Sequence, residues 1–286
     1  MEEPDTDPAG RDAPFIHGPP ARRGRDTVQI VAVGLAAGFL SGLFGVGGGV
    51  LLVPGLVLVL GMDQRRAHGT SLAAIVPIGL AGVAGYALSG EVDWPAALLL
   101  VVGAAGLGAR IGTHLLHALP VRLLALVFAA LLVATAVRLL TGDTVTSPRG
   151  DLTVGSALGL VGLGVVAGTL SGLLGVGGGI VTVPALVLLL GVPAAVAKGT
   201  SLAVIVPTAV AGTRRNRARG YADLRTAAVV GVAGIASSFA ASLLAVGLDE
   251  RLSNRMFAAL VLAAAVKLVW DDRRRAAGTG DQSVAT

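Results

Sequence analysis

The chain has 286 residues, of which 54% are hydrophobic and 14% are charged, and it contains no cysteine. Its mean hydropathy is +0.81, and a water-soluble domain would have about 25% charged residues, so we expect an integral membrane protein. The absence of cysteine excludes disulfides, thiolate catalysis, iron–sulfur clusters and cysteine-ligated zinc. The net charge of +5 does not indicate nucleic-acid binding, because most arginines lie in short clusters beside apolar segments, where they orient membrane spans.

The N-terminal region combines a polar tail with a long apolar run. Residues 1–26 are rich in Pro, Gly, Asp and Arg, which predicts a disordered cytoplasmic tail. The run from Val28 to Leu60 would span about 50 Å as one helix, well beyond a hydrocarbon core of about 30 Å. It must therefore break or fold back. We predict the break at Gly45–Gly49, because glycine is the costliest helix residue after proline, with Pro54 favouring a restart.

Further apolar segments predict the remaining membrane helices. They are Gly69–Ser89, Trp94–Leu116, Val121–Leu140, Val154–Leu190, Gly199–Gly212, Leu224–Val246 and Leu252–Trp270. The segments predict an all-α polytopic membrane protein with eight to ten helical segments.

The order of these segments repeats. SGLFGVGGGVLLVP from Ser41 matches SGLLGVGGGIVTVP from Ser171 at ten of fourteen positions, with an offset of 130 residues. AHGTSLAAIVP from Ala67 matches AKGTSLAVIVP from Ala197 at nine of eleven positions, with the same offset. Later landmarks shift by one residue. We therefore predict two transmembrane repeats. The predicted units are repeats at 27–140 and 153–270, a linker at 141–152 and a cytoplasmic C-terminal tail at 271–286.

The basic residues favour an inverted arrangement of the two repeats. If the first apolar run returns to its starting side, each half makes an odd net number of crossings. Fifteen basic residues then lie on the inner side and four on the outer side, against thirteen and six if the run crosses once. The inverted model with both termini in the cytoplasm is preferred. The sequence leaves open whether the glycine break is a re-entrant hairpin.

The glycine runs are the first candidate binding site. GVGGG lacks the spacing of a dinucleotide fingerprint or a phosphate loop. Three consecutive glycines expose backbone amides, and broken helices in inverted repeats can aim positive helix N-termini at an anionic substrate. The predicted substrate-binding glycines are Gly45, Gly47, Gly48, Gly49, Gly175, Gly177, Gly178 and Gly179. Close helix packing is predicted instead for glycines spaced by four residues. These are Gly34, Gly38, Gly42, Gly164, Gly168 and Gly172.

The repeated GTSL motif adds paired hydroxyls near the start of two spans. The hydroxyls can cap the helices, donate to a ligand, or do both. Equivalent positions just before them hold His68 and Lys198, so one cation and several neutral donors could meet an anion between the halves. A snorkelling role at the interface is the alternative for Lys198. The further substrate-binding candidates are His68, Thr70, Ser71, Lys198, Thr200 and Ser201.

Arg110 is the remaining candidate, because ionisable residues inside a membrane span are functional candidates by default. It could instead snorkel to the interface. His114 and His117 have helical spacing, but no Asp, Glu or Cys accompanies them in the span, so no metal site is predicted. No acidic residue lies deep in a predicted span, which disfavours a cation pathway and suits an anion. No cofactor is expected.

On the duplicated GLFGVGGGVLLVP and GLLGVGGGIVTVP segments, each followed by GTSL, the chain resembles the sulfite exporter TauE/SafE family, also called the toluene sulfonate uptake permease family. The resemblance covers about residues 28–270. It implies a cytoplasmic-membrane transporter of small sulfur oxyanions or organosulfonates, such as sulfite or sulfoacetate. It also implies that Gly45–Gly49, Thr70, Ser71 and their repeat partners line the path. Substrate identity does not transfer, because the family is functionally mixed.

The expected function is secondary transport of a small anion by alternating access, in the plasma membrane of a bacterium. The alternatives are a passive anion channel and a non-transporting membrane scaffold. An enzyme is not expected, because the deep segments supply hydroxyls but no carboxylate or thiol to activate them. The expected partners are a small anion, the lipid bilayer, a coupling proton or sodium ion, and a second copy of the chain in a homodimer.

Overall fold

The computed structural model describes residues 25–104, 121–141, 153–174 and 178–280. These residues form ten helices and no strand, which confirms the all-α fold. The helices are α1 (Arg25–Phe44), α2 (Gly49–Leu60), α3 (Gln64–Leu88), α4 (Trp94–Val101), α6 (Val121–Thr141), α7 (Val154–Leu174), α8 (Gly179–Leu190), α9 (Ala194–Ala218), α10 (Leu224–Gly247) and α11 (Glu250–Gly280). Four segments within them are long and apolar enough to cross a membrane: Thr27–Phe44, Gln64–Leu88, Ala194–Ala218 and Leu224–Gly247.

The first apolar run breaks at its glycines, as predicted. α1 ends just before Gly45, and α2 begins just after Gly48. The chain then folds back, because Gly48 lies against Ala37 of α1 and Gly55 lies against Val33, one turn nearer the start of α1. The predicted restart at Pro54 is wrong by five residues, since α2 already begins at Gly49.

Several helices are longer than their apolar segments. α3 and α9 begin five residues before the predicted starts at Gly69 and Gly199. Asp63 caps α3, since its carboxylate accepts a hydrogen bond from the Arg65 N–H at 3.0 Å. α11 continues to Gly280, so the first part of the predicted C-terminal tail is helical. Apolar composition marks the part of a helix that suits lipid, whereas the helix itself continues through polar residues beyond it.

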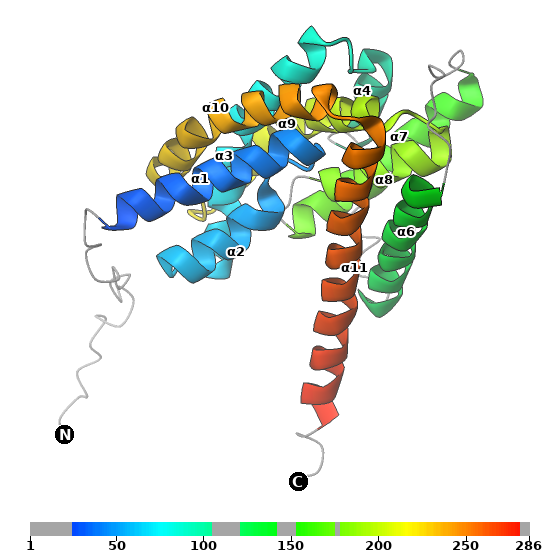
Figure 1. Cartoon of the computed structure of the whole chain (residues 1–286). Coiled ribbons are helices and arrows are strands. Elements are labelled where there is room, and N and C mark those ends of the chain that lie inside the picture. Colours follow the sequence, from blue (N-terminus) through cyan, green and yellow to red (C-terminus); the bar gives the residue numbers. More distant parts are fainter. Residues whose placement is uncertain (1–24, 105–120, 142–152, 175–177, 281–286) are drawn as a thin grey trace, which may run out of the picture.

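Two pairs of equivalent helices have equal lengths, and the members of the longer pair run in opposite directions. α2 and α8 each have 12 residues, and α3 and α9 each have 25. Gly69, near the start of α3, lies against the Tyr221 carbonyl beyond the end of α9. Gly199, near the start of α9, lies against the Glu91 carbonyl beyond the end of α3. α3 and α9 therefore run antiparallel, and they lie side by side near α1 and α10 (Figure 1).

The glycines spaced by four residues pack helices together, as predicted. Along α1, the contacts on α10 are Gly34 with Val230, Gly38 with Gly234 and Gly42 with Ser238. In the second half, Gly164 lies against Leu100 of α4 and Gly168 against Ala104. In every pair the contact includes a backbone carbonyl oxygen, so no Cβ atom would fit without a shift. Gly172 lies outside the residues whose surroundings are described.

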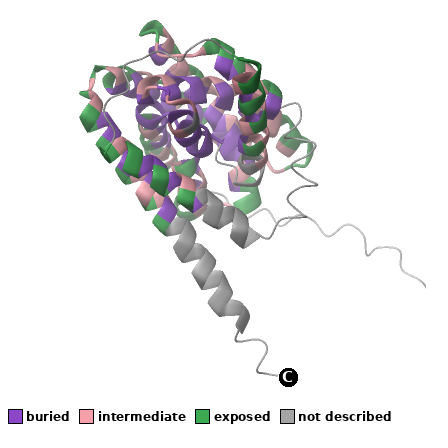
Figure 2. Cartoon of the chain, turned by 90° about the vertical axis from the view of Figure 1, so that its right-hand side faces the viewer, coloured by how far each residue is buried: buried purple, intermediate pink, exposed green. Residues whose placement is uncertain are grey.

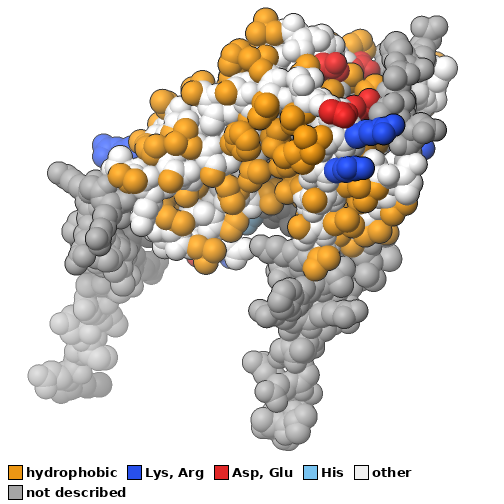
Figure 3. All heavy atoms as spheres, viewed as in Figure 1, with side chains coloured by type: hydrophobic (Ala, Val, Ile, Leu, Met, Phe, Trp, Pro, Cys, Tyr) orange, Lys and Arg blue, Asp and Glu red, His pale blue; other side chains and the backbone are white. Residues whose placement is uncertain are grey.

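Apolar side chains cover the outer surface as well as the core. Buried residues lie in the interior of the molecule, where the helices pack against one another (Figure 2). Hydrophobic side chains also cover much of the surface seen in Figure 3. Val28, Leu58, Leu88 and Val154 are 71%, 82%, 75% and 79% exposed. Soluble proteins rarely expose large continuous apolar surfaces, so this surface is suited to lipid.

Candidate functional site

The two glycine breaks meet between α3 and α9. A Cβ atom added to Gly179, at the start of α8, would lie 2.9 Å from both the Gly45 carbonyl oxygen and the Val46 Cα. The same atom would lie 2.5 Å from Ile205 of α9, and one added to Gly47 would lie 3.0 Å from Ile205. Segments that lie about 130 residues apart in the sequence are therefore in direct contact.

The breaks require glycine for two reasons. Gly45, Gly47 and Gly48 have φ values of +69°, +77° and +70°, and Gly178 has +77°. This left-handed conformation disfavours residues with a Cβ atom. A Cβ atom on Gly48 would also lie 2.7 Å from the carbonyl oxygen of Ala37. Of the other predicted glycines, Gly175 and Gly177 lie outside the described residues.

Each break starts a short helix that has no side-chain cap. Gly48 and Gly178 are the N-cap residues of α2 and α8. The first hydrogen bonds of α2 run from the Leu51 and Leu52 N–H groups to the Gly48 carbonyl. The amides of Gly49 and Val50 accordingly have no acceptor among the described residues. Helix N-termini of this kind carry partial positive charge and attract anions.

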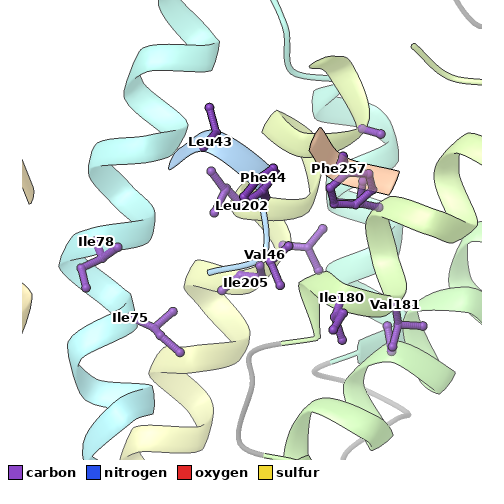
Figure 4. Close-up of a cluster of buried hydrophobic side chains, with 14 of the residues drawn as sticks. Leu43, Phe44, Val46, Ile75, Ile78, Ile180, Val181, Leu202, Ile205 and Phe257 are labelled. Atoms are coloured by element: carbon purple, nitrogen blue, oxygen red, sulfur yellow. The ribbon is translucent and has the colours of Figure 1, made fainter. Parts of the chain in front are cut away.

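Apolar side chains surround the breaks. Figure 4 shows Val46 and Ile205 close together, with Ile75 on the facing helix and Ile180 and Val181 on α8. Ile75 and Ile205 are equivalent residues of the two repeats, and both have 0% exposure. Such surroundings lower the local dielectric and strengthen the electrostatic effect of the helix N-termini.

Thr70 and Thr200 link the two halves. The Asp223 N–H donates to the Thr70 hydroxyl oxygen at 3.0 Å, and the Asp93 N–H donates to the Thr200 hydroxyl oxygen at 2.9 Å. Both threonines are fully buried. The capping alternative for these hydroxyls is wrong, because α3 and α9 begin six residues before the two threonines and have Asp63 and Pro193 as their N-cap residues.

The neighbouring serines differ between the halves. The Ser71 hydroxyl donates to the His68 carbonyl at 2.9 Å within α3. The Ser201 hydroxyl is fully buried and has no hydrogen-bond partner among the described residues. His68 is half-buried, and its Nδ1 atom also lacks a partner there.

Lys198 is a buried cation beside the first break. Its side chain is 1% exposed, and a Cβ atom on Gly45 would lie 2.5 Å from its Cα. The ammonium donates to the Ser253 hydroxyl at 2.7 Å and lies 5.5 Å from the centre of the Phe257 ring. The structure contradicts the snorkelling alternative, because the side chain is directed to α11 and does not reach the surface.

Sequence reasoning missed Ser253 and its buried neighbour Asn254. Both lie at the start of the last apolar segment, where polar residues are expected at a helix end. A signal was nevertheless present, because at the later repeat offset of 129 residues the equivalent residues are Leu124 and Ala125. The substitution of polar for apolar residues in only one repeat marks these positions.

The remaining candidate, Arg110, lies outside the described residues, as do His114 and His117. Among the residues that the structure describes, no group of three or more His, Asp or Glu side chains could hold a metal ion.

Comparison with known proteins assigns the family. The family model described as "Sulfite exporter TauE/SafE" matches residues 9–139 and 160–285. The chain belongs to the TauE/SafE family. It is therefore a multi-pass membrane transporter, not an enzyme, and acts on a small molecule within a lipid bilayer.

Curated relatives of this TauE/SafE chain carry general names. It is 30% identical over 255 residues to a "Probable membrane transporter protein" of Xylella fastidiosa strain Temecula1, covering 85% of this chain and 97% of the relative. Bacillus subtilis YunE, "Probable membrane transporter protein YunE", is 28% identical over 68% of this chain and 80% of the relative. "Probable membrane transporter protein YjnA", from the same species, is 27% identical over 85% of this chain and 100% of the relative. No solved structure matches the chain.

Proposed function

We propose that the protein is a secondary transporter of a small anion, namely a sulfur oxyanion or an organosulfonate such as sulfite or sulfoacetate. The observation that carries this proposal is the contact between the two glycine breaks, which places the start of α8 against the break that precedes α2. Unpaired helix-start amides and the buried Lys198 together offer an anion partial and full positive charge. Membership of the sulfite exporter TauE/SafE family supports sulfur oxyanions as the substrate class.

The proposed path is lined by the glycine breaks, Lys198 and the neighbouring polar groups. His68, Ser71, Ser201 and Arg110 belong to this proposed lining. For Thr70 and Thr200 we propose a positioning role, because each hydroxyl already accepts a hydrogen bond from a loop of the other half.

The proposed architecture is a pair of inverted repeats, residues 27–140 and 153–270, joined by the linker 141–152, in a bacterial plasma membrane. The antiparallel α3 and α9 support it. Both tails, 1–26 and 271–286, would then lie in the cytoplasm. The two threonine links lie at opposite ends of this helix pair, so opening one at a time would give alternating access. A proton or sodium gradient would supply the energy, and a homodimer is compatible with this arrangement.

Transport in proteoliposomes tests the proposed function. Radiolabelled sulfite, sulfoacetate and sulfate would be offered to the purified protein with and without a pH or sodium gradient. Saturable, gradient-dependent flux of a sulfur anion is the expected result. Flux that does not saturate and does not depend on either gradient would indicate a channel. If none of the anions crossed the membrane, the proposal would be contradicted.

A matched pair of glycine variants tests the site. Gly48 and Gly90 have φ values of +70° and +75°, but only a Cβ atom on Gly48 meets a neighbour, the Ala37 carbonyl oxygen at 2.7 Å. Both Gly48→Ala and Gly90→Ala strain the backbone. We expect Gly48→Ala to abolish flux in folded protein and Gly90→Ala to retain it. Full flux in Gly48→Ala would overturn the site assignment, and loss of assembly in place of flux would favour the scaffold.

A further inference from the structure

The two repeats differ at one buried polar cluster. Lys198, Ser253 and Asn254 are buried in the second half. Their repeat equivalents are His68, Leu124 and Ala125. The glycine breaks and the GTSL motifs, by contrast, are present in both halves. The shared features offer the same partial charges in both halves, so the cluster found in one half is the better candidate for choosing between anions.

No carboxylate among the described residues supplies a counter-charge to the Lys198 ammonium. Among the residues that the structure describes, its only hydrogen-bond partner is the neutral Ser253 hydroxyl, and no carboxylate forms an ion pair with it. The Phe257 ring contributes a cation–π contact. A hydroxyl and a ring offset only part of the free energy needed to bury a full charge. A bound anion would provide the missing negative charge.

The cluster also has unused hydrogen-bonding capacity. An ammonium has three N–H donors, and Ser253 accepts one of them. Buried polar atoms are normally paired, and the two remaining N–H donors of the ammonium, which have no acceptor among the described residues, can bind the oxygens of an anion. The contact of Lys198 with Gly45 places the cluster beside the first break.

We propose that Lys198 and Ser253 form a subsite with a single positive charge, which selects monoanions over dianions. This inference rests on the proposed function and specifies its substrate class. A monoanion neutralises the ammonium. A dianion would leave one negative charge unpaired in an apolar environment, which is strongly unfavourable. Simple alkyl sulfonates and hydrogen sulfite carry one charge, whereas sulfate, fully ionised sulfite and sulfoacetate, which adds a carboxylate, carry two. Within the proposed substrate class, the subsite therefore favours hydrogen sulfite and simple sulfonates over sulfoacetate.

Equilibrium binding tests the subsite independently of transport. Calorimetric titration of the purified full-length protein at neutral pH would compare methanesulfonate, which has a fixed single charge, with sulfate. We expect methanesulfonate to bind at least about tenfold more tightly than sulfate. Raising the pH from slightly acidic to neutral should weaken the apparent affinity for total sulfite, as hydrogen sulfite ionises, by a larger factor than the affinity for methanesulfonate. Equal affinities, or no binding of methanesulfonate, would overturn the inference.

Three variants test whether Lys198 supplies the positive charge of the subsite. Lys198→Gln should weaken methanesulfonate binding at least about tenfold and remove the preference over sulfate. Ser253→Ala retains the charge, so it should weaken binding by only a few fold and keep the preference; it also carries the test if Lys198→Gln fails to fold. Arg255→Gln removes a charge from the exposed face of the same helix and should change nothing. Wild-type affinity in folded Lys198→Gln would overturn the subsite.

Binding and flux together separate the two proposals. If methanesulfonate binding depended on Lys198 but no anion crossed the membrane, the proposed anion transport would be contradicted and the monoanion subsite would be supported. Saturable flux with no preference for monoanions would support the proposed anion transport and overturn the monoanion subsite.

Discussion

At the scale of single residues, the distance between helices depends on the absence of side chains. Gly42, near the end of α1, lies against the Ser238 carbonyl of α10. The Tyr86 hydroxyl donates to the Gly42 carbonyl at 2.8 Å, which satisfies an acceptor that the end of the helix leaves unpaired. Gly42 thus allows α10 to approach on one side, and on the other side its carbonyl oxygen accepts the hydrogen bond from Tyr86 of α3.

Enlarging Gly42 should therefore separate the helices. We expect Gly42→Val to lower the free energy of unfolding by about 3 kcal/mol or to prevent folding, because overpacking and loss of the Tyr86 contact combine. Thermal unfolding in detergent would measure the change. Gly159→Ala in α7 is the control, since a Cβ atom there meets nothing within 4 Å, and it should be neutral or stabilising by about 1 kcal/mol. Equal effects of the two substitutions would show that contact with α10 is not the cause.

Glu91, between α3 and α4, should make stability depend on pH. Burial raises the pKa of its carboxyl group, and the neighbouring Glu250 carboxylate raises it further. The folded state therefore holds this proton more tightly than the unfolded state. Stability from this group is present below the ordinary carboxyl pKa and is lost as the pH rises through the raised value.

Glu91→Gln removes this effect. We expect the variant to have a higher unfolding temperature than the wild type at neutral pH, and the difference to disappear in acid. Melting curves from pH 4 to 8 would check it, with Asp249→Asn as a control for an exposed carboxylate nearby. A difference that grows as the pH falls would show that the ionised form is the one that the fold stabilises.

At the scale of the helices, two hydrogen bonds hold the long antiparallel pair to the opposite half. Thr70 in α3 binds the loop before α10, and Thr200 in α9 binds the loop before α4. Gly69 and Gly199 allow those loops to approach. In each GTSL motif, the glycine therefore allows a loop of the other half to approach, and the threonine binds that loop through a buried hydrogen bond.

Replacing a threonine tests these links. Thr70→Val keeps the shape but leaves the Asp223 N–H without an acceptor, which should cost about 1–3 kcal/mol of stability. Thr70→Ser retains the hydroxyl and should cost less. Equilibrium unfolding of both variants, with Thr200→Val for the other link, would measure the difference. If serine proved as damaging as valine, the lost methyl group would be the cause and the hydrogen bond would not matter.

Local patterns predicted the helices and the breaks, but not the partners of the polar residues. Glycine propensity and bilayer thickness were sufficient to place the break before Gly49. The Thr70 hydroxyl, however, meets a residue 153 positions away, and Lys198 meets one 55 positions away. Such pairs depend on how helices pack, which spacing within one segment does not encode. For Ser253, comparison of the repeats marks the position as unusual, but its partner Lys198 is known only from the packing of α9 on α11.

At the scale of the whole molecule, the helices of the two halves alternate in space. α1 packs on α10, α3 packs on α9 and α10, and α4 packs on α7. Each of these contacts joins an early helix to a late one, and most are made through small residues. The halves therefore share one interior, and they are not separate folding units, although each contains a complete copy of the repeated motifs.

From these contacts between early and late helices, we expect the covalent link between the halves to be dispensable. If the chain is cut within residues 142–152, the fragments still present complementary glycine-lined faces, so co-expressed fragments should reassemble into a functional carrier. Either fragment alone would leave those faces bare and should be degraded. Co-purification through a tag on one fragment, followed by the flux assay, would measure this complementation. The role of the linker would then be only to ensure that the two repeats are synthesised in equal numbers.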